Sequence, residues 1–495
     1  AGASAPASAR DLEGTTIVVL PPWVVKARRA CFPREIGPGS PLEGSRPDCR
    51  RAVGGVPSAA MEPRLQLALD FVDLHRALRA AKEAVRGGVE VLEVGTPLLK
   101  AEGLDAVRQI RAAFPGVELV CDGKTMDAGR LELETAAKAG ASVGTVLGVA
   151  SDSTIEECCE AGLNYGIKVL VDLLGCEDPA GRAQFAASVG AHAVNVHCPI
   201  DDQVRGLDPL DTLRSVRAAV SIPVTVAGGI TARTAPDVVA AGADVVIVGG
   251  AITKAQDAEA AAREILTAMR TGVAGRSETA ERGSSEADIR EIFQAVSTPN
   301  VSDAMHRAPC WSGLIATAPG ARVAGKAVTC RAMPGDWAKP VEAIDRCEPG
   351  DVLVIDSGGV PPAVWGELAT NSAKNKGLAG VVVLGAIRDT ADIRAMGFPV
   401  FATTASSNAG EPRGFGEIDV ALRVDGIVCR PGDWIVADDD GVMVVPREKA
   451  VEIANRAMYC LEAENRIRAE INDGGGTLAQ VADLYKWEKR VVGRH

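Results

Sequence analysis

The sequence has few aromatic residues and no long apolar run. Tryptophan, tyrosine and phenylalanine make up 3% of the 495 residues, although hydrophobic residues as a whole make up 47%. No apolar stretch approaches the roughly 18 residues that suggest a membrane-spanning helix, so we expect no segment that crosses a bilayer. At about 100 to 200 residues per domain, the length predicts two or three folded domains.

Paired cysteine motifs and an excess of positive charge are also missing. The twelve cysteines are spread along the chain without a CxxC pair, which fits neither a zinc cage nor a small disulfide scaffold and favours a reducing compartment. Lysine and arginine number 53 against 65 aspartate and glutamate, a formal net charge of -12. We therefore expect no nucleic acid partner and no membrane partner, and any phosphate must be held by a local site.

Residues 1–62 have the composition of a flexible N-terminal extension. They are rich in alanine, proline, glycine, serine and arginine and show no periodic apolar pattern. Both a plain disordered tail and the remnant of an organelle-targeting segment fit this composition. The expected location is accordingly cytoplasmic, or the plastid stroma if the extension is a targeting remnant.

Residues 63–270 repeat one pattern eight times. A short β-rich apolar run is followed by a helical stretch and a glycine-containing turn. Eight such units over about 200 residues predict a closed TIM (β/α)8 barrel within an overall α/β fold class. An open doubly wound sheet is the competing fold, but no GxGxxG motif follows the first strand. The predicted strands are LQLALDFV, VEVLEVGT, VELVCDGK, SVGTVLGVA, KVLVDLLG, HAVNVHC, PVTVAGGI and DVVIVGGA.

The remaining chain predicts a linker, a second domain and a tail. Residues 271–287 are polar, charged and rich in glycine and serine, as linkers are. Residues 288–470 begin with a helix, continue through valine- and glycine-rich strands and end in a charged helical segment. Because the strands cluster instead of alternating strictly with helices, we expect an α+β domain or an α/β/α sandwich. Residues 471–495 are expected to form a C-terminal tail.

Charged residues interrupt the predicted barrel strands near their C-terminal ends, where barrel enzymes place their chemistry. These residues are Asp70, Glu93, Asp122, Lys124 and His197. A single charge at such a position is commonly a strand cap or a structural ion pair, because burying an unpaired charge is costly. Five of them on one rim favour a functional site.

The residue types suggest chemistry on an oxyanion. Glu93 and Asp122 are hard oxygen ligands suited to Mg²⁺ or another divalent cation, which would stabilise an enediolate. Lys124 lies between two carboxylates in DGKTMD, which keeps it charged and able to neutralise a substrate oxygen. His197 can transfer protons near neutral pH.

Two glycine pairs end the seventh and eighth predicted strands. Gly228 with Gly229 and Gly249 with Gly250 expose backbone N–H groups in the arrangement by which barrels bind a substrate phosphate. One such pair is also common in turns, whereas two successive pairs are more specific.

Together with the runs EVGTPLLKAEG and DGKTMDAG, these residues resemble the 3-hexulose-6-phosphate synthases of the orotidine-5'-phosphate decarboxylase superfamily. The resemblance implies an Mg²⁺-dependent aldolase that joins ribulose 5-phosphate to formaldehyde, or cleaves the product. It implies that Glu93 and Asp122 bind the metal, that Lys124 stabilises the enediolate and that Asp70 and His197 are catalytic. It also implies an obligate barrel dimer in which Asp127 reaches the site of the other subunit.

The related 3-keto-L-gulonate-6-phosphate decarboxylases are the alternative. They carry a phosphate-side arginine where Ala251 follows the last glycine pair here, and no arginine directly follows His197. The aldolase is therefore preferred. Cys198 and Pro199 follow His197 where small residues are usual in the family.

Three segments stand out in the second domain: PGDW, WGELAT and GAIRDTAD. Glu367 and Asp389 are suited to a hydrated divalent ion, and Arg388 to a carboxylate or enolate, although a surface ion pair explains them equally well. The segments resemble the RraA-like family, which includes oxo-acid aldolases, oxaloacetate decarboxylases and a regulator of ribonuclease E. The resemblance implies a trimer and, with the barrel dimer, a hexamer or larger homo-oligomer. A non-catalytic module that binds a protein partner is the alternative.

Overall fold

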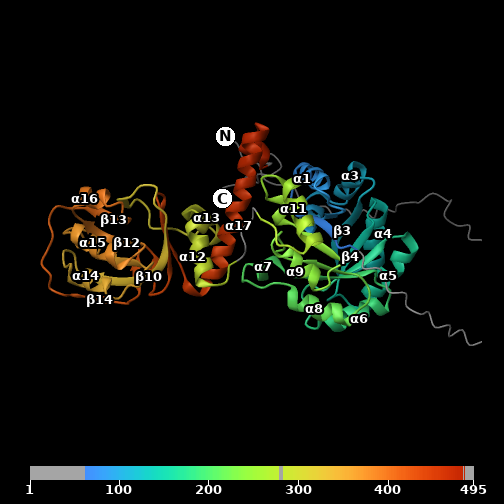
Figure 1. The fold of residues 1–495 in the computed structure, drawn as a ribbon, viewed down its shortest axis with the longest axis horizontal. Helices are drawn as coiled ribbons and strands as arrows, with labels where there is room; N and C mark the ends of the chain where they lie inside the picture. Colours follow the sequence, from blue (N-terminus) through green and yellow to red (C-terminus); the bar gives the residue numbers. More distant parts are fainter. Residues whose placement is uncertain (1–61, 278–282, 483, 485–495) are drawn as a thin grey trace, which may run out of the picture. The chain divides into compact units, whose positions relative to one another are not determined.

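The structure is a computed structural model that describes residues 62–277, 283–482 and 484 (Figure 1). Apart from Glu62, the predicted N-terminal extension lies outside the described residues. Among the described helices, none combines the length and the apolar character that a membrane span requires.

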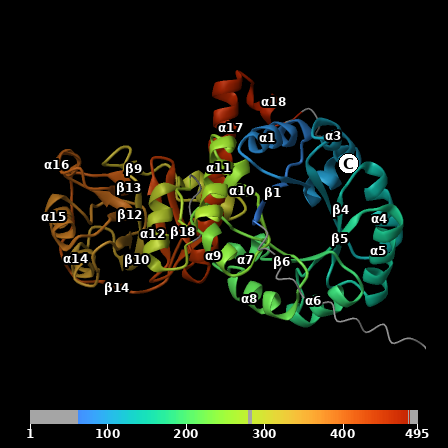
Figure 2. The ribbon, with the colours of Figure 1, turned by 45° about the vertical axis from the view of Figure 1, so that its right-hand side comes forward.

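Eight parallel strands close into a barrel in chain order, with β8 paired to β1. The predicted TIM barrel is confirmed, and its helices surround the strands (Figure 2). The strands are β1 (Arg64–Leu69), β2 (Val91–Val94), β3 (Glu118–Thr125), β4 (Val143–Leu147), β5 (Lys168–Asp172), β6 (Ala193–His197), β7 (Val224–Ala227) and β8 (Val245–Val248). The helices are α1 (Leu74–Arg86), α2 (Thr96–Glu102), α3 (Asp105–Ala113), α4 (Gly129–Ala139), α5 (Asp152–Tyr165), α6 (Pro179–Ser188), α7 (Ile200–Gln203), α8 (Leu210–Ala219), α9 (Ala235–Ala240), α10 (Gly250–Thr253) and α11 (Ala258–Thr271).

Strand alternation separates the helix-facing core from the polar interior of the barrel. Val194 and Val196 of β6 belong to the core beneath the helices, so Asn195 between them points into the barrel. Asn195 pairs in register with Asp172 on one side and Thr225 on the other. Because paired residues of a parallel sheet point to the same face, these three buried polar side chains form one row inside the barrel.

The second domain contains a mixed sheet, in agreement with the expected α/β class. Strands β10, β11, β12 and β13 are parallel neighbours at its centre, and antiparallel strands extend it on both sides. A separate hairpin is formed by β15 and β16. The strands are β9 (Ile315–Ala316), β10 (Val323–Ala332), β11 (Val352–Asp356), β12 (Gly380–Ile387), β13 (Val400–Ala405), β14 (Gly416–Ile418), β15 (Leu422–Val424), β16 (Ile427–Cys429), β17 (Trp434–Asp438) and β18 (Gly441–Val445).

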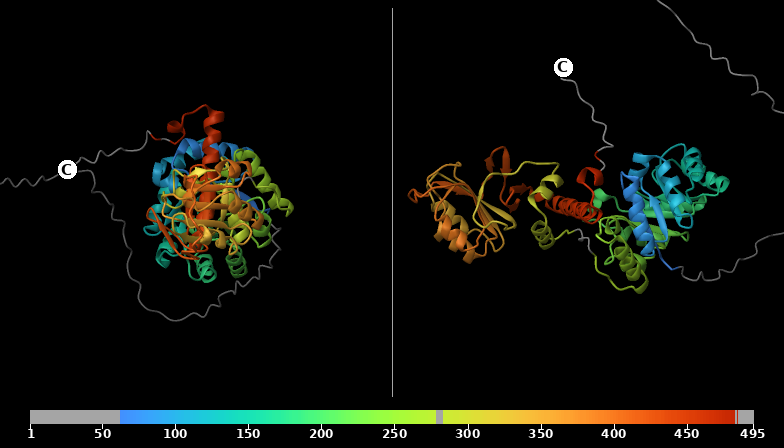
Figure 3. Two further views of the ribbon diagram at one scale, coloured as in Figure 1. Left: turned by 90° about the vertical axis from the view of Figure 1, so that its left-hand side faces the viewer. Right: turned by 90° about the horizontal axis from the view of Figure 1, so that it is seen from above.

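Helices α12 to α17 of this domain belong to two apolar cores. Helices α14, α15 and α16 pack on the parallel strands, with Ala343, Ala373 and Ile393 in one core. Helices α12, α13 and α17 form another core with Trp434 of β17, and α17 is drawn in red in Figure 3. The bounds are α12 (Glu286–Ala295), α13 (Thr298–Ala304), α14 (Ala338–Ile344), α15 (Glu367–Lys376), α16 (Thr390–Ala395), a 3-10 turn (Arg447–Lys449), α17 (Ala450–Gly474) and α18 (Leu478–Val481).

Candidate active site

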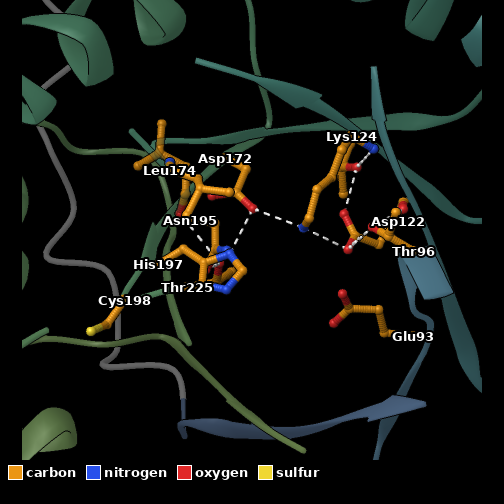
Figure 4. Close-up of polar contacts among 12 residues, drawn as sticks. Glu93, Thr96, Asp122, Lys124, Asp172, Leu174, Asn195, His197, Cys198 and Thr225 are labelled. Atoms are coloured by element: carbon orange, nitrogen blue, oxygen red, sulfur yellow. Dashed lines mark hydrogen bonds and ion pairs between the residues drawn. The ribbon is translucent and has the colours of Figure 1, made fainter. Parts of the chain in front are cut away.

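Four titratable side chains meet at the C-terminal ends of β3, β5 and β6 (Figure 4). The Lys124 ammonium lies 2.8 Å from Asp122 Oδ2 and 3.6 Å from Asp172 Oδ2. His197 Nδ1 lies 2.9 Å from the same Asp172 oxygen. Asp172 therefore links the lysine to the histidine, and the structure brings the predicted residues Asp122, Lys124 and His197 together.

Hydrogen bonds hold Asp122 and Lys124 in place. Thr145 Oγ1 donates to Asp122 Oδ1 at 3.0 Å and Thr96 Oγ1 donates to Asp122 Oδ2 at 2.8 Å. The Lys124 backbone N–H donates to Thr145 Oγ1 at 3.0 Å, while Lys124 has a left-handed φ of 46°. A non-glycine residue at positive φ is uncommon and costs energy, so the surrounding contacts hold this strained turn.

Burial opposes the charges of Lys124 and Asp172, and neighbouring charges restore them. Burial lowers the pKa of Lys124, but the carboxylates of Asp122 and Asp172 raise it by more. The pKa of Lys124 is therefore above its usual value. Burial raises the pKa of Asp172, but the interaction with His197 and the charge of Lys124 lower it by more. The pKa of Asp172 is therefore below its usual value. An ammonium and a carboxylate consequently persist side by side at neutral pH.

Glu93 and Asp70 lie beside the cluster, where burial and neighbouring carboxylates disfavour their ionised forms. Burial, followed by repulsion from Asp122 and Asp70, raises the pKa of Glu93 well above its usual value. Gln66 Nε2 donates to Glu93 Oε2 at 2.6 Å. Asp70 is open to solvent at the barrel mouth, yet surrounding protein displaces water from its carboxylate, and together with repulsion from Asp122 this raises its pKa.

This crowding of carboxylates fits a divalent cation. The acidic side chains of Asp70 just after β1, Glu93 on β2 and Asp122 on β3 repel one another, and a cation between Glu93 and Asp122 would relieve that repulsion. Within the described ranges, no three histidine, cysteine, aspartate or glutamate side chains form a ready metal cage. Mg²⁺ commonly takes only one or two carboxylates and keeps water or substrate oxygens as its other ligands.

Both glycine pairs lie at the mouth of the barrel. Gly228 and Gly229 have φ values of 120° and 66°, and a Cβ on Gly228 would lie 2.6 Å from the Cys198 carbonyl oxygen. A Cβ on Gly249 would lie 3.7 Å from Asp70 Oδ2. The first pair therefore packs against the residue that follows His197, the second pair lies near Asp70, and Gly228 admits no side chain.

The predicted residue Asp127 lies apart from the cluster. It is exposed, and its Oδ1 accepts a hydrogen bond from the backbone of Ala128 at 2.7 Å. Among the described residues, Asp127 makes no hydrogen bond or ion pair with Asp122, Lys124 or His197, and its role at the site of a second copy remains a prediction.

The predicted residues of the second domain lie together where β12 ends and α15 begins. Asp389 Oδ2 accepts a hydrogen bond from the Glu367 backbone N–H at 3.2 Å and lies 3.5 Å from Arg388 Nε. Gly366 permits this approach, because a Cβ there would lie 2.6 Å from the same oxygen. Arg388 and Asp389 are exposed, whereas Glu367 is half-buried and contacts Asn371.

Sequence reasoning missed Asp172 and the polar residues below it. Asp172 ends the apolar run KVLV as Asp122 ends its own strand, so the same signal was available. Thr225 Oγ1 donates to Asn195 Oδ1 at 2.8 Å, and both are buried. Neutral polar residues within a strand give no comparable sequence signal, because strands tolerate threonine well.

The closed barrel and its ring of charges at the strand ends define a (β/α)8 enzyme architecture. Residues 63–265 match the model of the orotidine 5'-phosphate decarboxylase / HUMPS family, and residues 298–444 match the RraA-like model, described as Aldolase/RraA. The chain belongs to the orotidine 5'-phosphate decarboxylase / HUMPS family and carries an RraA-like domain. It is an enzyme of the lyase type.

Curated relatives match the barrel over nearly their whole length. The 3-hexulose-6-phosphate synthase of Mycobacterium gastri is 42% identical over 206 residues, which cover 42% of this chain and 99% of the relative. The enzyme of that name from Methylomonas aminofaciens is 41% identical over 201 residues, covering 40% and 96%. The solved RNA-processing inhibitor RraA from Thermus thermophilis is 33% identical, with 30% of this chain and 92% of that chain covered and a TM-score of 0.29.

Proposed function

We propose that the barrel is an Mg²⁺-dependent aldolase that interconverts ribulose 5-phosphate plus formaldehyde with 3-hexulose 6-phosphate. The observation that carries the proposal is the chain of contacts from Asp122 through Lys124 and Asp172 to His197. It joins a fixed cation to an oriented imidazole, the two groups that formation of an enediolate requires. The relatives named 3-hexulose-6-phosphate synthase support the choice of substrates.

His197 is the proposed proton carrier. A carboxylate only accepts hydrogen bonds, so Asp172 fixes the tautomer in which His197 Nδ1 carries the proton and Nε2 is free to act as a base. The C1–H bond of ribulose 5-phosphate breaks, its proton moves to Nε2, and its electron pair enters the enediolate. The enediolate C1 then bonds to the formaldehyde carbon, whose oxygen takes the proton from His197.

Lys124 and the acidic residues stabilise the charge that develops during this step. The Lys124 ammonium is held between two carboxylates and would offset negative charge on the enediolate oxygens. Glu93 and Asp122 would hold Mg²⁺, which when bound supplies further stabilisation of the substrate oxygens. Asp70 at the mouth orients substrate hydroxyls, and the two glycine pairs bind the phosphate through backbone N–H groups.

An assay of the full chain with ribulose 5-phosphate, formaldehyde and Mg²⁺ tests the proposal. We expect formation of hexulose phosphate, and we expect Asp122→Ala to abolish it while the circular dichroism spectrum is unchanged. Asp211→Asn is the matched control, because the Asp211 side chain is fully exposed and pairs with the exposed Arg214. A wild-type chain that forms no hexulose phosphate, or an active Asp122→Ala variant, contradicts the proposal.

For the second domain we propose an oxo-acid aldolase or decarboxylase activity at Glu367, Arg388 and Asp389. The approach of Asp389 to Glu367 and Arg388 supports it, since two carboxylates and a guanidinium suit a divalent ion and an oxo-acid carboxylate. Oxaloacetate turnover that is lost in Asp389→Ala and kept in Asp392→Ala supports this activity. If the wild type turns over neither oxaloacetate nor related oxo acids, a role in binding a protein partner replaces the enzymatic one.

We also propose that the chain forms homo-oligomers through both domains, with a barrel dimer and a trimer of the second domain. Large apolar side chains are exposed on each: Met126, Leu131, Val149 and Leu163 on the barrel, and Met333, Trp337, Val360, Leu368 and Phe415 on the second domain. Exposed apolar patches commonly mark interfaces. The domain division at 63–270, 271–287, 288–470 and 471–495 belongs to the same proposal, and a monomeric mass in light scattering contradicts the assembly.

A further inference from the structure

Helix α17 contacts both the second domain and the barrel. Its first half places Ile453, Ala454 and Ala457 in an apolar core with α12, α13 and β17 of the second domain. Further along, Glu462, Arg466 and Glu470 recur every fourth residue and are buried. Residues four apart lie on one helix face, and this face contacts barrel residues. The barrel and the second domain form one compact unit.

The first contact fixes the loop that follows His197 and β6. Asn455 of α17 is completely buried, and its Nδ2 donates to the Val204 carbonyl at 2.9 Å and to the Gly283 carbonyl at 3.0 Å. Val204 directly follows helix α7. Nearby, Arg456 Nη2 lies 3.2 Å from Asp201 Oδ1 of the same loop. Because Asn455 is buried, losing its hydrogen bonds would leave backbone groups unsatisfied.

The loop held by Asn455 also contacts residues next to His197 and the first glycine pair. Gln203 at the end of α7 donates from Nε2 to the Cys198 carbonyl at 2.8 Å, next to His197. Gln203 Oε1 also lies 3.3 Å from the position that a Cβ on Gly229 would take. The loop held by Asn455 therefore packs against the first glycine pair.

The second contact fixes the loop that follows β8. Lys254, just beyond the second glycine pair, lies 3.5 Å from Glu462 Oε2 and 2.9 Å from the centre of the Tyr459 ring. A Cβ on Gly250 would lie 3.5 Å from Lys254 Nζ. Arg466 Nη1 donates to the carbonyl of Ala255 at 3.1 Å. Glu462 and Tyr459 thus hold the lysine beside the second glycine pair.

We infer that helix α17 of the second domain is a positioning element of the barrel site, which sets the loops that bind the phosphate monoester of the substrate. The inference rests on the proposed function, in which the two glycine pairs hold that phosphate. The loop after β6, which packs against the first glycine pair, and the loop after β8, which carries the second pair, are both tied to this helix. Asn455 and Glu462 are positioning residues that touch no substrate.

Glu462→Gln in the full chain is the decisive variant, because it keeps the shape of the side chain and removes the charge opposite Lys254. We expect the KM for ribulose 5-phosphate to rise about three- to tenfold, with kcat changed less than about twofold. Glu464→Gln is the matched control on the same helix, since Glu464 is exposed. Asn455→Ala is expected to act in the same direction, with its melting temperature measured alongside.

Calorimetric titration with inorganic phosphate separates this inference from the proposed function. We expect Glu462→Gln to weaken the phosphate Kd by the same factor as KM, and Glu464→Gln to match the wild type. If the wild type forms no hexulose phosphate but its phosphate affinity still depends on Glu462, only the proposed chemistry is contradicted. A wild type that does not bind phosphate, or equal constants in all three chains, overturns the inference, whether or not Asn455→Ala folds.

Discussion

At the scale of single residues, Asp172 joins the Lys124 ammonium to the His197 imidazole. One of its oxygens faces both His197 and Lys124, and its other oxygen accepts the Leu174 backbone N–H at 3.0 Å. With both oxygens engaged, the carboxylate has a single orientation. The imidazole and the ammonium are therefore held at fixed positions relative to each other, as preorganised catalysis requires.

We predict that Asp172→Asn lowers kcat about 10²- to 10³-fold with little effect on KM. The amide no longer selects the tautomer with Nδ1 protonated and no longer holds the charge of Lys124. Steady-state kinetics on ribulose 5-phosphate measure the split, and Asp211→Asn should behave as the wild type. A change confined to KM would show that Asp172 binds substrate instead of orienting His197.

The raised pKa of Glu93 predicts how Mg²⁺ stabilises the protein at different pH. A carboxyl whose folded pKa is raised stabilises the metal-free fold below its ordinary pKa, and this stabilisation is lost as the pH rises through the folded pKa. Mg²⁺ requires the ionised group, so its binding becomes stronger over the same rise in pH.

The increase in melting temperature caused by Mg²⁺ should therefore be larger at about pH 8 than at about pH 5. Glu93→Gln should remove most of the increase, because the amide binds Mg²⁺ weakly and carries no proton to displace. Differential scanning fluorimetry with and without Mg²⁺ measures it. An Mg²⁺ effect of the same size at both pH values would argue against Glu93 as a ligand.

Several members of the charged cluster could be predicted from the sequence, because a charge that ends an apolar run stands out. Asp122, Lys124 and His197 were found in this way, and Asp172 carries the same signal. Thr145 and Asn195 could not be predicted, since a neutral polar residue inside a strand does not stand out in the sequence. Their partners, moreover, come from neighbouring strands many residues away.

At the scale of elements, the turn after β7 depends on Gly228. Its φ of 120° is unfavourable for any side chain, and a Cβ would collide with the carbonyl of Cys198. The two loops after β6 and β7 are therefore packed backbone to backbone. This contact fixes the distance between His197 and the first glycine pair.

We predict that Gly228→Ala lowers the free energy of unfolding by about 1–2 kcal/mol or more and raises the KM for ribulose 5-phosphate. The added methyl group must push the loops apart. Gly116→Ala is the control, because a Cβ there meets no atom within 4 Å and Gly116 has no positive φ. Denaturant titration and kinetics on both variants decide the matter, and equal results for the two would refute the role given to this turn.

The barrel strands could be predicted because each is local and repeats with its helix. The sheet of the second domain could not, since its order places β10 between β11 and the distant strand β17. The barrel-facing side of α17 was also missed, because Glu462, Arg466 and Glu470 belong to a charged segment that is ordinarily exposed to solvent. Here Arg466 and Glu470 pair with each other at 3.0 Å while buried.

At the scale of the whole molecule, Arg466 ties α17 to the barrel. It contacts Glu83 of α1 at 3.2 Å and the carbonyls of Ala255 and Gln256, while Arg76 provides Glu470 with a second partner at 3.1 Å. The described tryptophans all lie in the second domain, at 311, 337, 365 and 434. The described part of the barrel contains no tryptophan, so the change in tryptophan fluorescence when the described residues unfold comes from the second domain, while Trp23 and Trp487 lie outside those residues.

We predict that Arg466→Ala costs about 3 kcal/mol, because it leaves buried carboxylates with fewer partners. Unfolding followed by fluorescence and by circular dichroism should coincide in the wild type and separate in the variant. Arg468→Ala, an exposed neighbour, should change stability by less than about 0.5 kcal/mol. Transitions that remain coincident in Arg466→Ala would show that the two halves do not depend on this residue.

A helix shared by two domains also limits how their common gene can change. Substitutions between residues 455 and 466 meet no reactant, yet they alter the surroundings of Val204 and Lys254 in the other half. Recombination that separated the barrel from α17 would expose the Val204 carbonyl and the Lys254 amine to water. Selection on either half therefore acts on both, and the fusion, once made, is inherited as a single unit.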